Sequence, residues 1–179
     1  MKPEYPKFKF CPKCATKLEI RSDLPAGEAG HAIKREYCPK CAFTHYVNPA
    51  PAAAVVIQED NKVLLVRRKF PPFAGLWQFP AGFVEWGETP EETAVKEAEE
   101  EAGVKVALQG LFAVEKVSDD PREEIVLIFY NAQIISGKPK AGSDADRVGW
   151  FSLDNLPKFG SRSHKKVLEK LKQTYTPGV

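Results

Sequence analysis

The chain has 179 residues, with 26 Lys and Arg against 24 Asp and Glu, so its formal net charge at pH 7 is only +2. A charge this small gives no electrostatic reason to expect a nucleic acid as a partner. Residues 1–10 lack the apolar core of a signal peptide, and no later apolar run is long enough to span a membrane. We therefore expect a cytoplasmic protein without a membrane partner, made of one ordinary domain and a small additional module.

All four cysteines lie near the beginning of the chain, in two Cys-Pro-Lys-Cys motifs at residues 11–14 and 38–41. Each motif can place two thiolates on one ion, and two such motifs make a closed tetrahedral Zn²⁺ site. The pattern predicts a structural zinc ion in a small ribbon. The expected ligands are Cys11, Cys14, Cys38 and Cys41.

The predicted zinc ribbon covers residues 1–49, with two short polar strands around the turn-rich segment 25–30. So small a module buries little apolar surface and would need the metal to fold. Disulfides and a redox pair are the alternatives, but the missing signal peptide argues against the first and the duplication against the second. His31 and His45 are expected at the surface, because the cysteines already fill the site.

The remainder of the chain alternates apolar runs with polar turns, and it ends in an amphipathic segment. This alternation favours an α/β fold. Strands are expected at residues 52–57, 62–68, 106–108, 111–117, 124–135 and 147–151, a helical turn at 152–157 and a helix at 161–175.

The segment 82–104, which we call the box segment, begins as a glycine-containing loop and continues as a helix. Thr89 can cap that helix, Pro90 suits its first position, and Glu92 stands where a capping box needs its acid. Gly103 is a natural end of the helix.

Three glutamates within this helix, Glu97, Glu100 and Glu101, follow the spacing i, i+3 and i+4 and therefore share one face. Carboxylates this close repel one another unless a cation joins them. Oxygen ligands of this kind suit Mg²⁺ or Mn²⁺. A solvated acidic helix is the alternative, and the preceding glycine loop argues against it.

The box segment resembles the signature of the Nudix hydrolases, which is Gly, five residues, Glu, seven residues, Arg-Glu, an aliphatic residue, any residue, Glu-Glu, any residue, Gly and an aliphatic residue. One position departs from it, because Lys96 stands where the family has arginine. A lysine lacks the planar fork with which arginine can orient a carboxylate. The positions in register are Gly82, Glu88, Glu97, Ala98, Glu100, Glu101, Gly103 and Val104.

The resemblance implies a mixed sheet sandwiched between helices in residues 50–179. It also implies Mg²⁺- or Mn²⁺-dependent hydrolysis of the pyrophosphate bond in a nucleoside diphosphate linked to another group. The partners it implies are a nucleotide-type small molecule and a second copy in a homodimer. The implied ligands of the catalytic metal are the Ala81 carbonyl, Glu97, Glu100 and Glu101.

The general base is left open between Glu97 and an acid on a later loop. The later candidates are Glu123, Glu124, Asp144 and Asp146. We favour Asp144, because in the family an acid often precedes a Trp-Phe pair at about this distance, and here that pair is residues 150–151.

Lys96 has two open interpretations. Glu92 and Glu100 lie four residues to either side, so a surface ion pair would explain the lysine. In the catalytic interpretation it holds Glu97 or Glu100 in place.

Substrate contacts are expected before and within the box segment. Arg67, beside Arg68, is expected to contact a diphosphate, although a solvated strand end is the alternative for at least one of them. A ring such as Phe73 or Trp77 can stack on a base, and burial in the core is the alternative. Gly82 and Glu88 are assigned to the loop around the substrate, where Glu88 supports the loop or reaches the metal through water.

The layout of a ribbon followed by GLWQFPAGFVEWGE (residues 75–88) resembles ADP-ribose and FAD pyrophosphohydrolases. The motif that follows the box in NADH pyrophosphatases is missing, so NADH is not favoured. The alternative function is a nucleotide sensor with a catalytically weak domain, in which the ribbon docks a protein or a nucleic acid.

Overall fold

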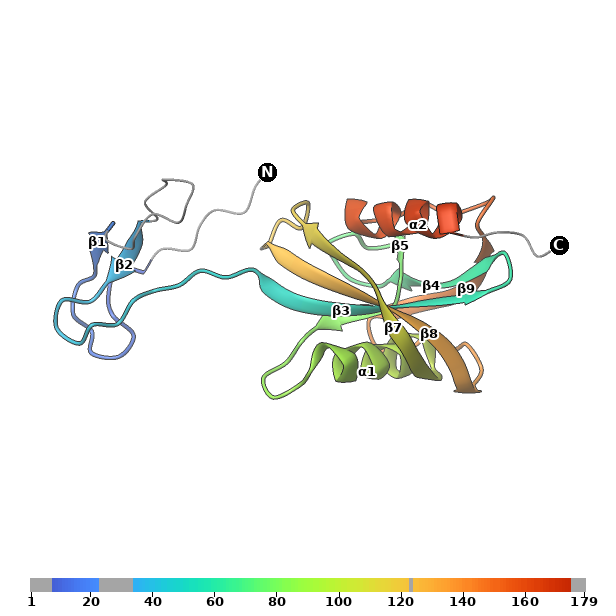
Figure 1. The fold of residues 1–179 in the computed structure, drawn as a ribbon, viewed down its shortest axis with the longest axis horizontal. Coiled ribbons are helices and arrows are strands. Elements are labelled where there is room, and N and C mark those ends of the chain that lie inside the picture. Colours follow the sequence, from blue (N-terminus) through green and yellow to red (C-terminus); the bar gives the residue numbers. More distant parts are fainter. Residues whose placement is uncertain (1–7, 23–33, 123, 175–179) are drawn as a thin grey trace. The chain divides into compact units, whose positions relative to one another are not determined.

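The computed structural model describes residues 8–22, 34–122 and 124–174 of the chain (Figure 1). It divides into two compact units, the first ending at Asn48 and the second beginning at Pro49. Among the described residues, no helix is long and apolar enough to cross a membrane.

The small unit contains two strands, β1 (Glu19–Arg21) and β2 (Arg35–Tyr37), paired antiparallel. Both strands were expected from the sequence. The turn-rich segment 25–30 and His31 lie outside the described residues.

The large unit is a seven-stranded mixed sheet in the order β5-β4-β3-β8-β7, with β6 paired to β3 and β9 paired to β4. Only β3 and β8 run parallel among the described pairs. The elements are β3 (Ala50–Glu59), β4 (Lys62–Arg68), β5 (Trp77–Gln78), β6 (Ala81–Phe83), α1 (Pro90–Ala102), β7 (Val104–Val117), β8 (Ile125–Gly137), β9 (Ala145–Ser152) and α2 (Arg162–Thr174).

The two helices cover opposite faces of this sheet, as Figure 1 shows. Alternate residues of β3 belong to different cores: Ala54 and Val56 pack on the side of α2, whereas Val55 and Ile57 pack on the side of α1. A strand buried on both faces is apolar throughout instead of alternating, which explains the continuous run in β3. The predicted sandwich of a mixed sheet between helices is confirmed.

Two predicted elements differ from the structure. The separate strands expected at 106–108 and 111–117 are one strand, β7, whose register against β8 shifts near Gly110. This glycine has a φ of 113°, so the chain accommodates an irregularity without ending the strand. At residues 152–157, where a helical turn was expected, the chain forms one hydrogen-bonded turn and no helix. A hydrogen bond from the Asn155 N–H to the Ser152 carbonyl closes this turn.

Both ends of α1 follow the sequence prediction. Thr89 and Glu92 form the reciprocal capping box, and Pro90 occupies the first turn. Gly103 ends the helix with a φ of 70°, and a Cβ added there would lie 2.8 Å from the Lys140 carbonyl oxygen. The glycine therefore meets two requirements at once, a left-handed backbone and a close approach of two chain segments.

A comparison of Gly103→Ala with Gly75→Ala distinguishes the effect of the left-handed backbone from the effect of the close approach. Gly75 has a φ of 77° but no atom within 4 Å of an added Cβ, so its variant should lose about 1 to 2 kcal/mol of unfolding free energy through backbone strain alone. Gly103→Ala should lose more, because the clash with Lys140 is added. Urea unfolding of both variants measures the difference, and equal losses would contradict the role of the close approach.

Candidate functional site

A cavity of about 370 Å³ opens beside α1 in the large unit. Its walls come from β6, α1, the end of β4, the loops before β8 and β9, and the start of α2. Its lining includes Arg68, Phe73, Ala81, Gly82, Phe83, Glu85, Lys96, Glu97, Glu100, Glu101, Asp120, Arg122, Asp144, Ser161 and His164.

The three glutamates of α1 line this cavity together, as their helical spacing predicted. Glu101 is only 3% exposed, and its carboxylate accepts a 3.0 Å hydrogen bond from the Ala81 N–H. Glu100 is exposed and Glu97 is half-buried. The bond to Ala81 fixes α1 against β6, so the box loop and the glutamate face meet at one place.

Gly82 is required by the approach of Glu97. A Cβ added at Gly82 would overlap the carboxylate of Glu97, so any side chain would displace that group. The box glycine therefore serves the packing of a glutamate against the backbone.

Burial raises the pKa of two of these carboxyl groups. The pKa of Glu97 rises to about 7, first through burial and then through the charge of Glu100. The pKa of Glu101 rises to about 8, mainly through burial, with the charge of Glu97 adding to it. The cluster therefore carries its full negative charge at neutral pH only when a cation compensates it.

Lys96 forms its ion pair with Glu88, at 2.6 Å between the Nζ and Oε1 atoms. Glu88 also accepts hydrogen bonds from the Thr93 hydroxyl and from the Glu85 N–H. The sequence suggested Glu92 or Glu100 as the surface partner of Lys96, or support of Glu97 or Glu100. The observed pair instead joins the helix to its own preceding loop.

The two arginines at the end of β4 lie differently. Arg67 forms a two-point ion pair with Asp146, with distances of 2.8 and 2.6 Å, and it is not among the cavity residues. Arg68 lines the cavity, where it donates to the Pro72 carbonyl at 3.0 Å. The structure thus brings Arg68, and not the predicted Arg67, beside the glutamates.

The two aromatic residues expected to stack on a base, Phe73 and Trp77, lie in different environments. Phe73 lines the cavity. Trp77 packs edge-on against Phe151, with ring centroids 4.5 Å apart, and contributes to the core. Core burial, the alternative considered for both rings, applies to Trp77.

Among the described candidates for the general base on a later loop, Asp144 is the one that lines the cavity. Glu124 pairs with Lys116 at 2.8 Å, and Asp146 is held by Arg67. Glu123 lies outside the described residues. Asp144 is exposed, and its charge contributes to raising the pKa of Glu97 and of Glu101.

The cavity wall opposite α1 was not predicted. Asp120 is buried and accepts hydrogen bonds from the Arg122 guanidinium at 2.7 and 2.9 Å, which lowers the pKa of Asp120 against the effect of burial. Arg122 also lies over the Phe83 ring, 5.6 Å from its centroid. Nothing in the polar loop sequence distinguishes these residues from solvated ones.

His164 is a further cavity residue that the sequence analysis missed. It is buried, and its Nδ1 accepts a hydrogen bond from the Phe79 N–H at 3.3 Å. Burial lowers its pKa to about 3, so the ring is neutral. The sequence did contain a signal for the burial of this histidine, because His164 shares the helical spacing of Val167, Leu168 and Leu171 on the buried face of α2.

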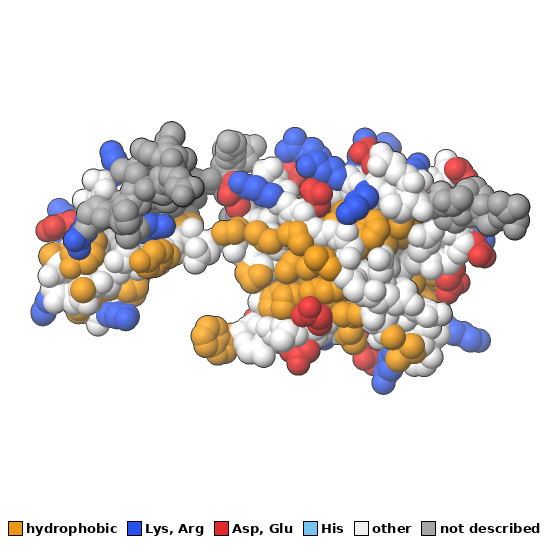
Figure 2. Space-filling view, in the orientation of Figure 1, with side chains coloured by type: hydrophobic (Ala, Val, Ile, Leu, Met, Phe, Trp, Pro, Cys, Tyr) orange, Lys and Arg blue, Asp and Glu red, His pale blue; other side chains and the backbone are white. Residues whose placement is uncertain are grey.

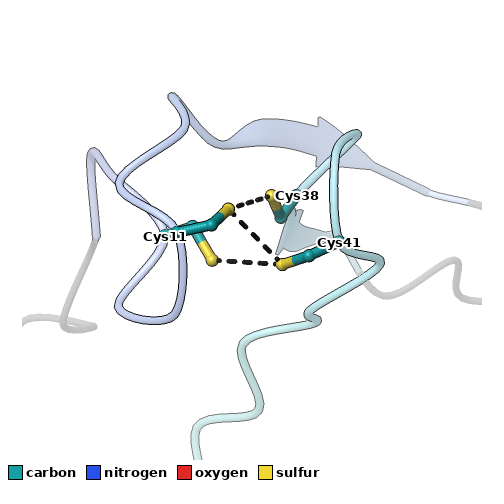
Figure 3. A group of neighbouring side chains, drawn as sticks. Cys11, Cys38 and Cys41 are labelled. Carbon is teal, nitrogen blue, oxygen red and sulfur yellow. Dashed lines mark hydrogen bonds between the residues drawn. The ribbon is translucent and has the colours of Figure 1, made fainter.

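A second candidate site lies in the small unit, where the four cysteine sulfurs lie within 4.8 Å of one another. Figure 3 shows the side chains of Cys11, Cys38 and Cys41 pointing toward one another. Sulfurs 3.5 Å apart, such as those of Cys11 and Cys41, fit a tetrahedral ion with Zn–S bonds of about 2.3 Å, which separates the sulfurs by about 3.8 Å. All four thiols are free, so the disulfide alternative does not apply.

The two cysteine motifs fold alike. In each one the N–H of the following alanine, Ala15 or Ala42, donates to the carbonyl of the first cysteine. Both alanines have a left-handed φ, 55° and 59°. His45 is buried and its Nδ1 lies 3.1 Å from Glu36, so the expected surface position of His45 is wrong, but it takes no place among the clustered cysteines.

In the part of the chain that the structure describes, no carboxylate cluster is gathered as tightly as the four sulfurs. Glu97, Glu100 and Glu101 line the same cavity without forming so tight a group. The oxygen-only donor set still fits Mg²⁺ or Mn²⁺.

Comparison with known proteins gives one family. Residues 48–171 match the family model described as NUDIX domain. The chain is 42% identical over 125 residues to an ADP-ribose pyrophosphatase of Methanocaldococcus jannaschii, covering 69% of this chain and 73% of that protein.

Two further relatives extend the comparison. A NAD-capped RNA hydrolase NudC of Chromobacterium violaceum is 35% identical over 83% of this chain, but the chain spans only 52% of that protein. The crystal structure of a NUDIX hydrolase from Nitrosomonas europaea superposes with a TM-score of 0.75, at 28% identity, over 96% of this chain and 97% of that one.

The partner of Lys96 can be tested through the pKa of Glu88. The hydrogen bond from Lys96 is the largest influence that lowers this pKa, so Lys96→Ala should raise it toward the ordinary value of a glutamate. Lys105→Ala is the control, because Lys105 pairs with Glu99. A carboxyl ¹³C titration by NMR, without divalent cations, measures both, and an unchanged Glu88 titration in Lys96→Ala would rule out the pair.

Proposed function

Because the chain belongs to the Nudix family, we propose that it hydrolyses the pyrophosphate bond of a nucleoside diphosphate linked to another group. The observation that carries this proposal is the convergence of Glu97, Glu100 and Glu101 on one cavity beside Ala81 and Gly82. We assign residues 50–179 to the hydrolase domain and residues 1–49 to a zinc ribbon.

The glutamates and the Ala81 carbonyl would hold the catalytic Mg²⁺ or Mn²⁺. Two observations fit such an ion: an oxygen-only donor set, and buried carboxyl groups whose raised pKa values a cation would lower. A divalent cation bound there supplies charge neutralisation of the diphosphate and a lowered pKa of bound water.

The side chains of the protein then divide the remaining tasks. Glu101 fixes α1 to β6 through the Ala81 N–H, and the pair of Lys96 with Glu88 holds the box loop on the helix. Arg68 presents positive charge at the cavity. Asp144 is the proposed general base, because it is exposed at the cavity rim and can accept a proton from an attacking water.

For the substrate we propose an ADP-ribose-like dinucleotide or a nucleotide sugar. The relative from M. jannaschii, whose name gives ADP-ribose, supports this choice with 42% identity. Phe73 and Phe83 at the cavity offer ring faces for a base, and Arg67 and Trp77 are proposed to act indirectly, by holding the end of β4 and β5. The homodimer stays a prediction, as does the cytoplasmic location, with which the free thiols agree.

Hydrolysis of a substrate panel with Mg²⁺ tests the proposed activity. ADP-ribose, FAD, NADH, a nucleotide sugar and an NAD-capped RNA should be compared by product chromatography, and ADP-ribose is expected to give the largest kcat/KM. Ligand-induced thermal shifts without turnover of any substrate would instead support a nucleotide sensor.

Glutamate variants test the metal assignment within the same assay. Glu100→Gln and Glu101→Gln should each lower kcat by on the order of 100-fold or more, because metal-dependent stabilisation of the transition state is worth several kcal/mol. Glu99→Gln is the matched control, since Glu99 lies on the exposed side of α1 and pairs with Lys105. Near-normal rates in both of the first variants would refute the assignment.

Zinc analysis tests the ribbon. The purified chain should contain one Zn²⁺ per molecule, and Cys38→Ser should lose it, because the ion needs all four thiolates. His45→Gln should keep the metal, since His45 pairs with Glu36. Elemental analysis after gel filtration measures the content, and zinc retention by Cys38→Ser would contradict the four-cysteine site.

A further inference from the structure

The small unit carries an uneven charge that the whole-chain value conceals. In the full sequence, residues 1–49 contain nine Lys and Arg against five Asp and Glu, whereas residues 50–179 contain 17 against 19. The described residues of the unit, 8–22 and 34–48, include seven of these Lys and Arg and two of the carboxylates, Glu19 and Glu36. Glu36 is buried against His45, which leaves Glu19 as the exposed carboxylate of this described part. Basic side chains outnumber acidic ones on the face of the ribbon drawn in Figure 2. The cations are Lys9, Lys13, Lys17, Arg21, Lys34, Arg35 and Lys40.

The proposed zinc site does not cancel this excess. A Zn²⁺ ion held by four thiolates carries a formal charge of −2, which lowers the formal charge of residues 1–49 from +4 to +2 and leaves the module positive. The positive charge of the chain is therefore concentrated in this module, since residues 50–179 have a formal charge of −2.

Strand register places arginines and tyrosines on one face of the ribbon. Arg21 lies opposite Arg35, and Glu19 lies opposite Tyr37. Because side chains alternate along a strand, these residues share a face. Ile20 and Glu36, which are also opposite each other, lie on the other one.

Tyr46 extends the same face. An antiparallel bridge joins Tyr37 to Thr44, so Tyr46, two residues farther on, lies beside Arg35. The two arginines each cover a tyrosine: Arg21 lies 4.7 Å from the Tyr37 ring centroid and Arg35 lies 4.7 Å from that of Tyr46. We call this set, Arg21, Arg35, Tyr37 and Tyr46, the Arg-Tyr face.

Two members of the Arg-Tyr face, Arg35 and Tyr37, are half-buried, and the other two are exposed. Tyr46 is 55% exposed, and Arg21 is exposed as well. An exposed ring beside a guanidinium offers two things together, a flat surface for stacking and donors for an anion.

Single-stranded nucleic acid has the chemistry that matches both. Its unpaired bases stack on aromatic rings and on guanidinium planes, and its phosphates pair with the surrounding cations. A duplex hides its base faces, and an acidic peptide would use the charges but leave the rings without a role. We propose that the Arg-Tyr face of the ribbon binds single-stranded nucleic acid, independently of the hydrolytic activity of the other unit.

Fluorescence anisotropy with the full-length, zinc-loaded chain tests this proposal. The probes are fluorescein-labelled oligo(U) and oligo(dT) of about 15 nucleotides, in buffer without added Mg²⁺. Both should bind and should be displaced poorly by a duplex of the same length. Tyr46→Ala should weaken binding between about fivefold and a hundredfold, the range measured for loss of one stacking ring.

Matched variants separate the Arg-Tyr face from general charge. Arg35→Gln should weaken binding and reduce its dependence on salt, because one phosphate contact is lost. Lys165→Gln removes the same charge from an exposed position of α2, and Ile20→Ser changes an exposed side chain on the opposite ribbon face. Both controls should bind like the unaltered chain.

Three results would overturn the proposal: no binding of either probe, equal weakening in the Lys165→Gln control, or equally effective competition by duplex or polyglutamate. The last result would mean that the ribbon attracts any polyanion. Zinc content is measured for every variant, and if Tyr46→Ala loses its metal, Arg21→Gln and Tyr46→Phe decide, with binding lost in the first and kept in the second.

Discussion

The buried carboxylate of Glu101 is the constraint on which the rest of the site depends. Burial of a charged group is costly unless hydrogen bonds or a cation compensate it, and the described structure gives Glu101 the Ala81 N–H as its donor. That bond brings α1 onto β6, and the missing side chain of Gly82 then lets Glu97 approach the same backbone. The box segment thus specifies the fold around the site and the site itself with the same residues.

The chain compensates this negative charge only in part. Lys96, the nearest cation on α1, forms its ion pair with Glu88, and its charge lowers the pKa of Glu97 less than burial raises it. Arg68 acts in the same direction on Glu101. The cations of the protein therefore neutralise the negative charge of the glutamates only partly, and this charge favours binding of an external cation. Such binding is the physical basis for a metal-dependent reaction at this cavity.

Sequence reasoning succeeded where a local rule determines the structure. Capping and helical spacing defined α1 and its glutamate face, and continuous apolar runs defined the strands buried on both sides. It failed where contacts between separate segments of the chain determine the position of a side chain. The Lys96–Glu88 pair spans a loop-to-helix junction, outside helical spacing, and the register of β4 against β9 shifts between Arg67 and Arg68. Adjacent residues of a strand point to opposite faces, but the sequence alone did not show which of these faces carries the cavity. His164 is different, because its place on the apolar face of α2 could have been read from the sequence.

The two units differ in what stabilises them, and this difference affects which side chains each unit can expose. The large unit buries both faces of its sheet, and aromatic side chains such as Phe79 and Phe129 form part of its core. The ribbon has too few residues for a core of that kind, and a metal held by four cysteines would replace it. Several of its rings, among them Phe10 and Tyr46, are exposed. A module whose stability comes from a metal can keep aromatic and basic side chains at its surface, where they are available for recognition.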